Sequence, residues 1–325
     1  MTTVYLHIGM PKTGSTSLQK FLFANRIQLL EEGYLYPITG TKEIGQIWDR
    51  YSHNSLSKQL ETKHDVWEQL QQEIEISKAQ NIVISSEFFT YPKRFFDNTN
   101  SIKKIRTYLQ NYSVKIIIYL RDQVDFLQSL YAQMIKSNLQ DSSIKIMIEK
   151  EKFRCYYYSM LERWSFVFGL ENILVRVFEK EQLKNANLYD DFLSAIHFPL
   201  LHDDFRIQPC YTNTSPSIKV IKIMRILNQY SHFLTERISF DQLDNLKIKK
   251  WINRQYSKKH THFLEYLSNQ NELTSTINRL PDFLISDYLL TSEEKYSLKQ
   301  EFLEENSRVA CRYLNRPDGK LFKAR

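Results

Sequence analysis

The feature that most constrains the fold is an apolar run followed by a loop of small residues and an amphipathic stretch at the start of the chain. Residues 4–8 are typical of a buried strand, and the loop after them reads GMPKTGSTS. Leucine and phenylalanine then recur at helical spacing over residues 18–31. A glycine loop between strand and helix directs backbone N–H groups and the positive end of the helix dipole toward an anion. We therefore expect a phosphate-type ligand here.

This loop is similar to a P-loop but lacks the lysine of that motif. Gly9 and Gly14 have the P-loop separation, yet Ser15 stands where the lysine belongs and Lys12 comes two residues before Gly14. A lysine placed earlier would meet the bridging end of the bound group. Further N–H and hydroxyl donors for the ligand come from Thr13, Gly14, Ser15, Thr16 and Ser17. A tight strand-to-helix turn that merely contains Lys12 is the alternative.

Composition limits the class of partner. The 325 residues carry 44 Lys and Arg against 37 Asp and Glu, a formal charge of +7, which suits anionic nucleotides or acidic glycans but not a dedicated nucleic-acid binder. Cys155, Cys210 and Cys311 have neither disulfide nor zinc-ligand spacing, which favours a reducing compartment. With no signal-type N-terminus and no long uncharged apolar run, we expect a cytoplasmic protein without a membrane span.

The order of elements predicts an α/β protein with a central parallel sheet covered by helices on both faces. Four strands are expected at residues 4–8, 81–86, 114–120 and 172–178. Helices are expected between and after them, at 18–31, 65–79, 101–110, 124–136 and 155–168, and near the end at 291–314. We expect a single domain over 1–325, with a nucleotide-binding core at 1–230 and a helical portion at 231–325 for acceptor recognition. Another helix should start with Ser215 as its cap and Pro216 in its first position.

A second group of candidate residues follows the strand at 114–120. Arg121 is placed at the strand exit, and Ser129 comes eight residues later, about two turns into the next helix. A guanidinium at a strand end is suited to bidentate contact with phosphate, and a hydroxyl can complete the shell. By themselves these two residues are equally compatible with a surface ion pair.

Together, PKTGSTSL and YLRDQVDFLQSLY strongly resemble the sulfotransferases that use 3′-phosphoadenosine 5′-phosphosulfate (PAPS). The resemblance extends through SSEFF and ENSRVACRYLNR and is closest to a bacterial, carbohydrate-type branch. It implies a P-loop-like fold in which the first loop holds the 5′-phosphosulfate, while Arg121 and Ser129 hold the 3′-phosphate. It further implies that Lys12 contacts the bridging oxygen, that 3′-phosphoadenosine 5′-phosphate (PAP) is the product, and that no metal is needed.

Two residues are candidates for the base that deprotonates the acceptor hydroxyl. Glu87 directly follows the strand at 81–86, so we expect it at the carboxyl edge of the sheet beside the loop. His53 competes, because an imidazole titrates near neutral pH. A surface glutamate at a helix N-terminus and a solvated histidine are the structural alternatives.

Other residues of the chain are compatible with more than one role. Asn213 and Ser215 are candidate nucleotide contacts by resemblance, or no more than a helix cap. Arg308 and Arg312 belong to a solvated helix face or support the acceptor site. The basic stretch 247–262 has no assigned role, and neither the acceptor nor the oligomeric state can be derived. The alternatives to a sulfotransferase are a P-loop kinase, although NIVISSE lacks the strand-end Asp of such enzymes, and a non-catalytic nucleotide- or glycan-binding module.

Overall fold

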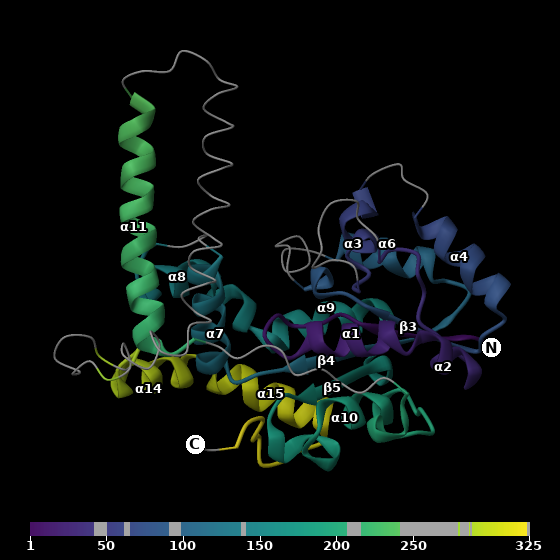
Figure 1. Cartoon of the computed structure of the whole chain (residues 1–325). Coiled ribbons are helices and arrows are strands. Elements are labelled where there is room, and N and C mark those ends of the chain that lie inside the picture. Colours follow the sequence, from purple (N-terminus) through teal and green to yellow (C-terminus); the bar gives the residue numbers. More distant parts are fainter. Residues whose placement is uncertain are drawn as a thin grey trace. The chain divides into compact units, whose positions relative to one another are not determined.

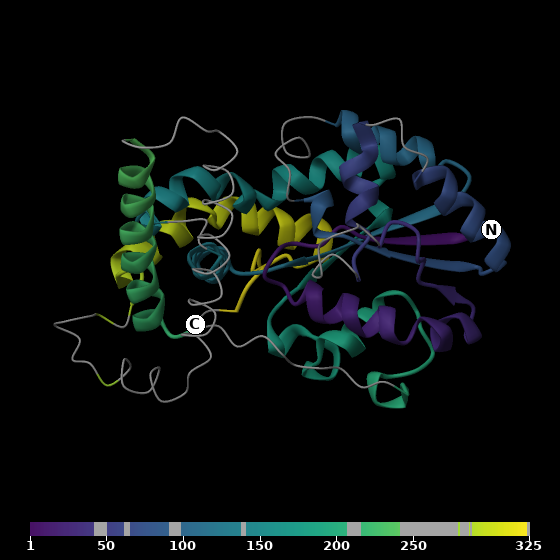
Figure 2. The ribbon, with the colours of Figure 1, turned by 45° about the horizontal axis from the view of Figure 1, so that its top comes forward.

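A computed structural model describes residues 1–41, 51–61, 66–90, 99–137, 141–206, 216–240, 279, 286 and 288–323 of the chain. Within these ranges the structure contains a parallel sheet with helices on both faces, as Figures 1 and 2 show. The predicted α/β class is confirmed. The basic stretch 247–262 and the candidate contacts Asn213 and Ser215 lie outside the described residues.

The sheet has the strand order β2-β3-β1-β4-β5, and all pairs are parallel. The strands are β1 (Thr3–His7), β2 (Tyr34–Leu35), β3 (Asn81–Ser85), β4 (Ser113–Leu120) and β5 (Ile173–Val177). The four predicted strands are present within one residue at each end, whereas the two-residue β2 is too short to give a sequence pattern. Because β3 and β4 flank β1 on opposite sides, the carboxyl end of β1 is a switch point, where such sheets bind ligands.

Alternation along the strands divides the core between two faces. One face packs against α1 and α10, with Tyr5, Val83, Ile117, Tyr119, Leu18, Phe21, Leu22, Phe192 and Leu193 buried together. The opposite face carries fully buried residues such as Leu6, Ile84 and Ile118, and there α9 and α15 contact β5. Since each fully buried aliphatic side chain stabilises the fold by about 1.5–3 kcal/mol, these two layers fix which face each strand residue takes.

Helices fill most of the remaining described chain. They are α1 (Ser15–Ala24), α2 (Arg26–Glu31), α3 (Asn54–Lys58), α4 (Val66–Ser77), α6 (Asn100–Tyr108), α7 (Gln123–Lys136), α8 (Ile144–Glu151), α9 (Tyr157–Phe168), α10 (Leu188–Ala195), α11 (Ile218–Phe240), α14 (Ser292–Glu301) and α15 (Leu303–Leu314). Short 3₁₀ turns follow two strands, at η3 (Glu87–Phe89) and η6 (Lys180–Gln182).

Two predicted helices are each divided in the structure, so their prediction as single helices was wrong. The stretch 18–31 breaks at Asn25, whose backbone N and side-chain Nδ2 both donate to the carbonyl of Phe21 at 3.1 Å. The stretch 291–314 breaks at Phe302, where φ is −100° and the ring is fully buried. Local competition by an asparagine amide and burial of an aromatic ring are both invisible to helical periodicity.

The start of α11 also differs from the prediction. The helix begins at Ile218, not at Pro216, because Ser217 acts as the cap: its Oγ accepts from the N–H of Val220 at 3.4 Å and its carbonyl from Ile221 at 3.0 Å. A Ser-Pro-Ser sequence before a helix offers two possible cap residues, since the φ of proline is also allowed outside the helix.

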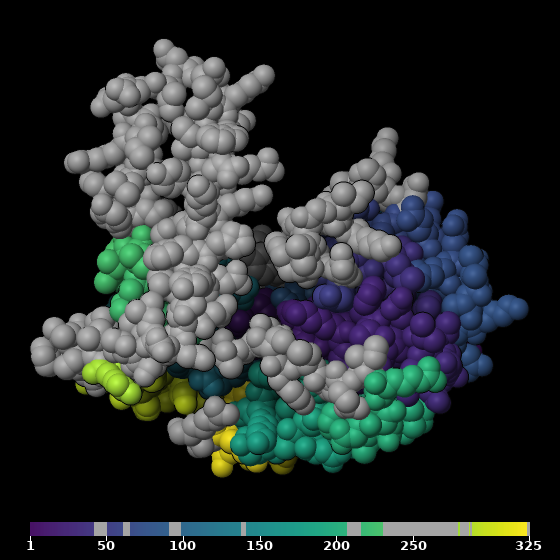
Figure 3. Space-filling model, viewed as in Figure 1, coloured from purple at the N-terminus to yellow at the C-terminus, as the bar shows by residue number. Residues whose placement is uncertain are grey.

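The chain divides into two compact units. The first unit comprises Met1–Asp122, Phe153–Thr212 and Glu301–Arg325, and the second comprises Gln123–Lys152 and Asn213–Gln300. The first unit holds the sheet. In it, Arg206 donates from Nη2 to Glu31 Oε2 at 2.7 Å and from its backbone N to Gln28 Oε1 at 3.0 Å. Figure 3 shows purple surface from the start of the chain beside green surface from its middle. In the second unit α7 packs on α8 and α11, and Asn228 donates to the carbonyl of Ile135 at 2.9 Å.

Among the helices in the described ranges, none combines the length and the apolar character that crossing a bilayer requires.

Candidate functional site

The loop between β1 and α1 has an unusual backbone. Gly9, Lys12 and Gly14 have φ values of 50°, 68° and 80°, all in the left-handed region. We call residues 9–14 the glycine loop. The carbonyl of Met10 closes it from inside, since it accepts hydrogen bonds from Thr13 Oγ1 at 2.7 Å and Ser15 Oγ at 3.2 Å. The hydroxyls of Thr13 and Ser15, both 2% exposed, therefore stabilise the loop itself.

The outer surface of the glycine loop is formed by other residues of the predicted set. Lys12 and Ser17 are partly exposed, and Thr16 is exposed. Gly14 precedes α1 with no side chain to cap it, so the first-turn N–H groups of α1 are left for another acceptor. Helix dipole, unsatisfied N–H groups and the Lys12 cation all favour negative charge at this point.

Gly14 is required by its surroundings as well as by its φ. A Cβ atom at this position would lie 2.5 Å from Leu188 Cδ2 and 3.4 Å from Phe178 Cε2. Phe178 follows β5, and Leu188 is the first residue of α10. Side chains from two distant segments therefore pack against Gly14, and we call Phe178 and Leu188 the seat of the glycine loop. Sequence reasoning did not single out either residue, and nothing in their local pattern distinguishes them from core residues.

The position of α10, and hence of Leu188, is fixed by an ion pair between the buried Asp191 and the partly exposed Arg176. Asp191 of α10 is fully buried and accepts hydrogen bonds at 2.8 Å from Arg176 Nε of β5 and from the hydroxyl of Tyr119 of β4. Because a buried carboxylate is costly unless it is paired, these contacts hold α10 against the sheet.

Arg121 lies at the exit of β4, as predicted, and contacts the glycine loop. Its Nη1 donates to the main-chain carbonyl of Lys12 at 2.8 Å, and its guanidinium carbon is 5.9 Å from the centre of the Phe178 ring. The hydroxyl of Tyr157 donates to the carbonyl of Arg121 at 2.7 Å, which fixes the backbone at the strand exit. The Arg121 side chain is thus bound to the backbone of the residue that carries the other predicted cation, Lys12, at the carboxyl edge of the sheet.

Glu87 lies beside the same loop. It begins η3 immediately after β3, and a Cβ atom built on Gly9 would be 3.3 Å from its Cα and Cγ atoms. The hydroxyl of Thr90, which follows η3, donates a hydrogen bond to the carbonyl of Gly9. Ser86 caps the turn, because its Oγ accepts from the N–H of Phe88 at 3.1 Å. The structure therefore brings a partly exposed carboxylate next to the glycine loop.

The position of His53 does not fit a general base. The ring is fully buried, its Nδ1 accepts from the N–H of Ser85 at 3.0 Å, and its Nε2 donates to the carbonyl of Pro37 at 3.0 Å. Burial lowers the pKa of His53 to about 4, against the smaller opposing effect of these backbone partners. With no free lone pair and no exposure, His53 is placed to support the end of β3, and we correct its assignment accordingly.

A second buried histidine lies beneath the glycine loop. His7 is the last residue of β1, and its Nδ1 atom is hydrogen-bonded to Ser85 Oγ at 2.8 Å. Gln19 of α1 donates from Nε2 to the same oxygen at 3.1 Å. Desolvation lowers the pKa of His7 to about 3. This layer ties β1, β3 and α1 together just below the loop.

Three further residues of the predicted set lie on α7 and α15. Ser129 is partly exposed on α7, in the second unit. Arg308 pairs with Glu304 at 2.5 Å and Arg312 with Glu162 at 3.1 Å, both on the exposed side of α15, which favours the solvated-face interpretation for these two arginines.

Comparison with known proteins identifies the region that carries the site. The family model described as "Sulfotransferase domain" matches residues 4–186, more than half of the chain. An uncharacterized protein of Archaeoglobus fulgidus is 26% identical over 233 residues, which are 71% of this chain and 53% of the relative, so the chain spans about half of the length of that relative. A crystal structure of a sulfotransferase from Alicyclobacillus acidocaldarius aligns with 71% of this chain and 89% of its own, at 17% identity and a TM-score of 0.39.

Proposed function

Because the chain belongs to the sulfotransferase domain family, we propose that it transfers a sulfuryl group from PAPS to a hydroxyl of a carbohydrate acceptor and releases PAP. The observation that supports this most directly is the hydrogen bond from Arg121 to the carbonyl of Lys12. It holds Arg121, which the proposal assigns to the 3′-phosphate, against the backbone of Lys12, which the proposal assigns to the phosphosulfate.

Each residue in the proposal has a chemical task. The N–H groups of the glycine loop and of the first turn of α1, with the hydroxyls of Thr16 and Ser17, would hold the 5′-phosphosulfate. Lys12 would stabilise the negative charge that develops on the leaving phosphate as the S–O bond to it breaks. Arg121 and Ser129 would bind the 3′-phosphate, with Asn213 and Ser215 as further nucleotide contacts.

Glu87 would act as the general base. The acceptor oxygen forms the new S–O bond while its proton passes to the Glu87 carboxylate, so charge and protons balance within the complex. The close approach of Glu87 to Gly9 supports this assignment, because acceptor and donor must meet at the glycine loop. Residues 231–325 would recognise the carbohydrate acceptor, as part of one functional domain that spans the whole chain.

A P-loop kinase is the second candidate, and residue chemistry at the end of β3 favours it less. A kinase of this class needs an Asp there for Mg²⁺, whereas Ser85 and Ser86 occupy this edge, and Ser86 Oγ donates to Asn54 Oδ1 at 2.6 Å. A non-catalytic binding module is the third candidate, and it would hold a nucleotide without turnover.

Calorimetric titration with PAP and, separately, with ATP·Mg²⁺ tests the proposal. We expect PAP to bind without added metal and Arg121→Ala to weaken that binding, while Arg308→Ala on the exposed face of α15 serves as the matched control. Tight binding of ATP·Mg²⁺ with no binding of PAP would contradict the proposal in favour of a kinase. Incubation with ³⁵S-labelled PAPS and a panel of polysaccharides then separates an enzyme from a binding module.

A further inference from the structure

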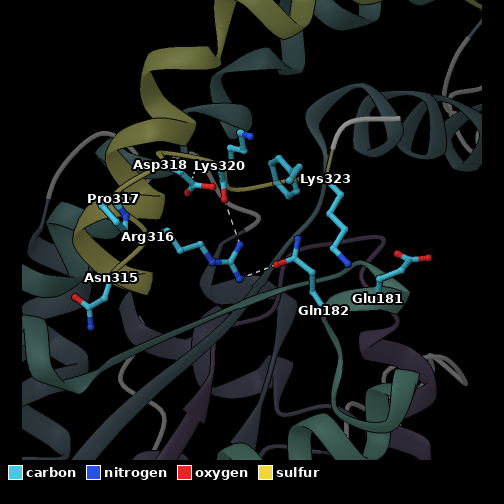
Figure 4. Close-up of a pocket in the computed structure, with 9 residues that line it drawn as sticks. Glu181, Gln182, Asn315, Arg316, Pro317, Asp318, Lys320 and Lys323 are labelled. Carbon is cyan, nitrogen blue, oxygen red and sulfur yellow. Dashed lines mark hydrogen bonds between the residues drawn. The ribbon is translucent and has the colours of Figure 1, made fainter.

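The chain segment after α15 returns to the turn that follows β5. The helix ends at Leu314 and is capped by Asn315, which has a φ of 54°. Residues 316–323, which we call the C-terminal strap, then run past η6. Arg316 donates from Nη2 to Gln182 Oε1 at 2.7 Å and from Nη1 to the carbonyls of Lys320 and Leu321 at 3.2 and 3.1 Å. Figure 4 shows the Arg316 guanidinium between the strap and Gln182. All these residues belong to the first unit.

The strap supplies the partners of a buried carboxylate. Glu179 is 5% exposed, and its Oε2 accepts from Gln182 Nε2 at 2.6 Å and from the backbone N–H of Lys323 at 3.1 Å. Gln182 also donates to the carbonyl of Leu321 at 3.1 Å, and the Leu321 side chain is buried. Gln182 is therefore the centre of the network, because it contacts Glu179, Arg316 and the strap backbone at once.

Glu179 immediately follows Phe178, and Phe178 belongs to the seat of the glycine loop. The Phe178 ring packs against Gly14 and lies under the Arg121 guanidinium. The backbone of Phe178 is held by a hydrogen bond from its N–H to the carbonyl of Leu120 at 2.7 Å. On the other side of Phe178, Glu179 is held by its backbone N–H, which donates to the carbonyl of Val177 at 2.9 Å, and by its carboxylate. A continuous series of contacts thus runs from the strap through Glu179 and Phe178 to the glycine loop.

The surface of this region is an open pocket of about 880 Å³. Its lining mixes both charge signs, with Glu181 and Asp318 beside Lys320 and Lys323 around Gln182 and Arg316. Gln182 and Lys323, which donate to the buried Glu179 carboxylate, both belong to this lining. Removing one donor leaves Glu179 under-satisfied, and the adjoining backbone at Phe178 is what can relax.

We propose that the C-terminal strap positions the donor site, with Gln182 and Glu179 acting as positioning residues that hold Phe178 against Gly14 and Arg121. That the ligand is PAPS rests on the proposed function, whereas the contacts between the strap, Glu179 and Phe178 do not depend on it. The strap therefore controls the order of the glycine loop and, through it, the affinity for the donor.

Hydrogen exchange on the ligand-free protein tests the strap without any nucleotide. In Gln182→Ala we expect amide exchange to be about tenfold faster at Leu18, whose N–H donates to the carbonyl of Gly14 at 3.1 Å, and at Phe178, while exchange in β4 stays as in the wild type. Arg308→Ala removes a charge from the same C-terminal region without touching the strap and should leave both unchanged. Exchange at Leu18 and Phe178 within twofold of the wild type, or a uniform increase that includes β4, would overturn the proposal.

A double-mutant cycle measured with PAP tests the route through Phe178. We expect Gln182→Ala and Phe178→Leu each to raise the PAP dissociation constant by about 5- to 20-fold, and the double variant to be no weaker than the weaker single variant. Additive effects would contradict action through Phe178. If wild-type protein binds no PAP, the proposed function fails, whereas the exchange experiment still decides the role of the strap.

Discussion

Arg121, at the end of β4, donates a hydrogen bond to the main-chain carbonyl of Lys12 at 2.8 Å, although the two residues are 109 positions apart in the chain. The guanidinium therefore fixes the backbone of the glycine loop, and its central carbon lies 5.9 Å from the centre of the Phe178 ring. One side chain thus combines a structural contact with a charge suited to a phosphate.

From this contact we predict that Arg121→Ala raises the PAP dissociation constant by roughly 10- to 150-fold, since lost charge-assisted hydrogen bonds cost about 1.5–3 kcal/mol. Arg121→Lys should recover little, because an ammonium cannot form the bidentate geometry. Calorimetry measures both, with Arg308→Ala as the control. An unchanged dissociation constant in Arg121→Ala would remove this residue from the site.

Lys12 should affect turnover more than folding. It is partly exposed in a loop, so Lys12→Ala should melt near the wild-type temperature, whereas sulfuryl transfer should fall by a factor on the order of 10² or more through loss of transition-state stabilisation. Lys299→Ala, an exposed lysine of α14, controls for the loss of charge. Near-normal turnover on an acceptor that the wild type sulfates would show that Lys12 has another role.

For Glu87 we predict a separation of binding from chemistry. Glu87→Gln keeps the shape of the side chain but accepts no proton, so PAP affinity should persist while turnover falls by about 10²- to 10⁴-fold. Glu68→Gln, at an exposed first-turn acid of α4, is the matched control and should behave as the wild type. Loss of PAP binding in Glu87→Gln would instead indicate that this residue holds the glycine loop.

Two glycines with the same backbone conformation separate strain from contact. Gly14 and Gly33 have φ values of 80° and 81°, but a Cβ atom at Gly33 meets nothing within 4 Å, whereas one at Gly14 meets Leu188 at 2.5 Å. Both alanine variants carry a left-handed backbone penalty of roughly 1–2 kcal/mol, and Gly14→Ala should lose a further ~1–3 kcal/mol from overpacking.

Urea unfolding of Gly14→Ala and Gly33→Ala measures this difference. In the Gly14→Ala background, Leu188→Ala should recover part of the loss, because it removes the clashing methyl group. Equal destabilisation of the two glycine variants would mean that the seat of the glycine loop relaxes freely.

The buried histidines predict loss of stability in acid. Burial lowers the pKa of His53 to about 4 and that of His7 to about 3, below the value of about 6.5 in an unfolded chain. The unfolded state therefore binds more protons below pH 6.5, so the stabilising contribution is complete above that pH and is lost progressively down to the folded pKa values.

His53→Gln tests this prediction, because a glutamine amide can accept from Ser85 and donate to Pro37 without titrating. The free energy of unfolding of this variant should fall less steeply between pH 6.5 and 4 than that of the wild type. The control is His197→Asn, at an exposed position with a φ of 57° that asparagine tolerates. The same slope in wild type and His53→Gln would contradict the burial argument.

Much of the fold followed from the sequence for a simple reason. Short β-branched runs are buried on both faces in a parallel sheet with crossover helices. The stretches between these runs were long enough to show the helical period. The places of Arg121 and Glu87 also followed, because residues that end parallel strands meet at one edge of the sheet. β2 and the breaks at Asn25 and Phe302 did not, since each depends on two or fewer residues.

The sequence by itself determined the α/β class, the glycine loop and the chemistry gathered at the carboxyl edge, because these depend on residue order and local backbone preference. Only the tertiary structure decided what each polar side chain does there. Thr13 and Ser15 are the same residue types as Thr16 and Ser17, yet the first pair turns inward to Met10. Packing alone buries His53 against two backbone groups and brings Gln182 to the C-terminal strap. Such long-range contacts depend on how distant segments meet when the core forms, which no local pattern encodes.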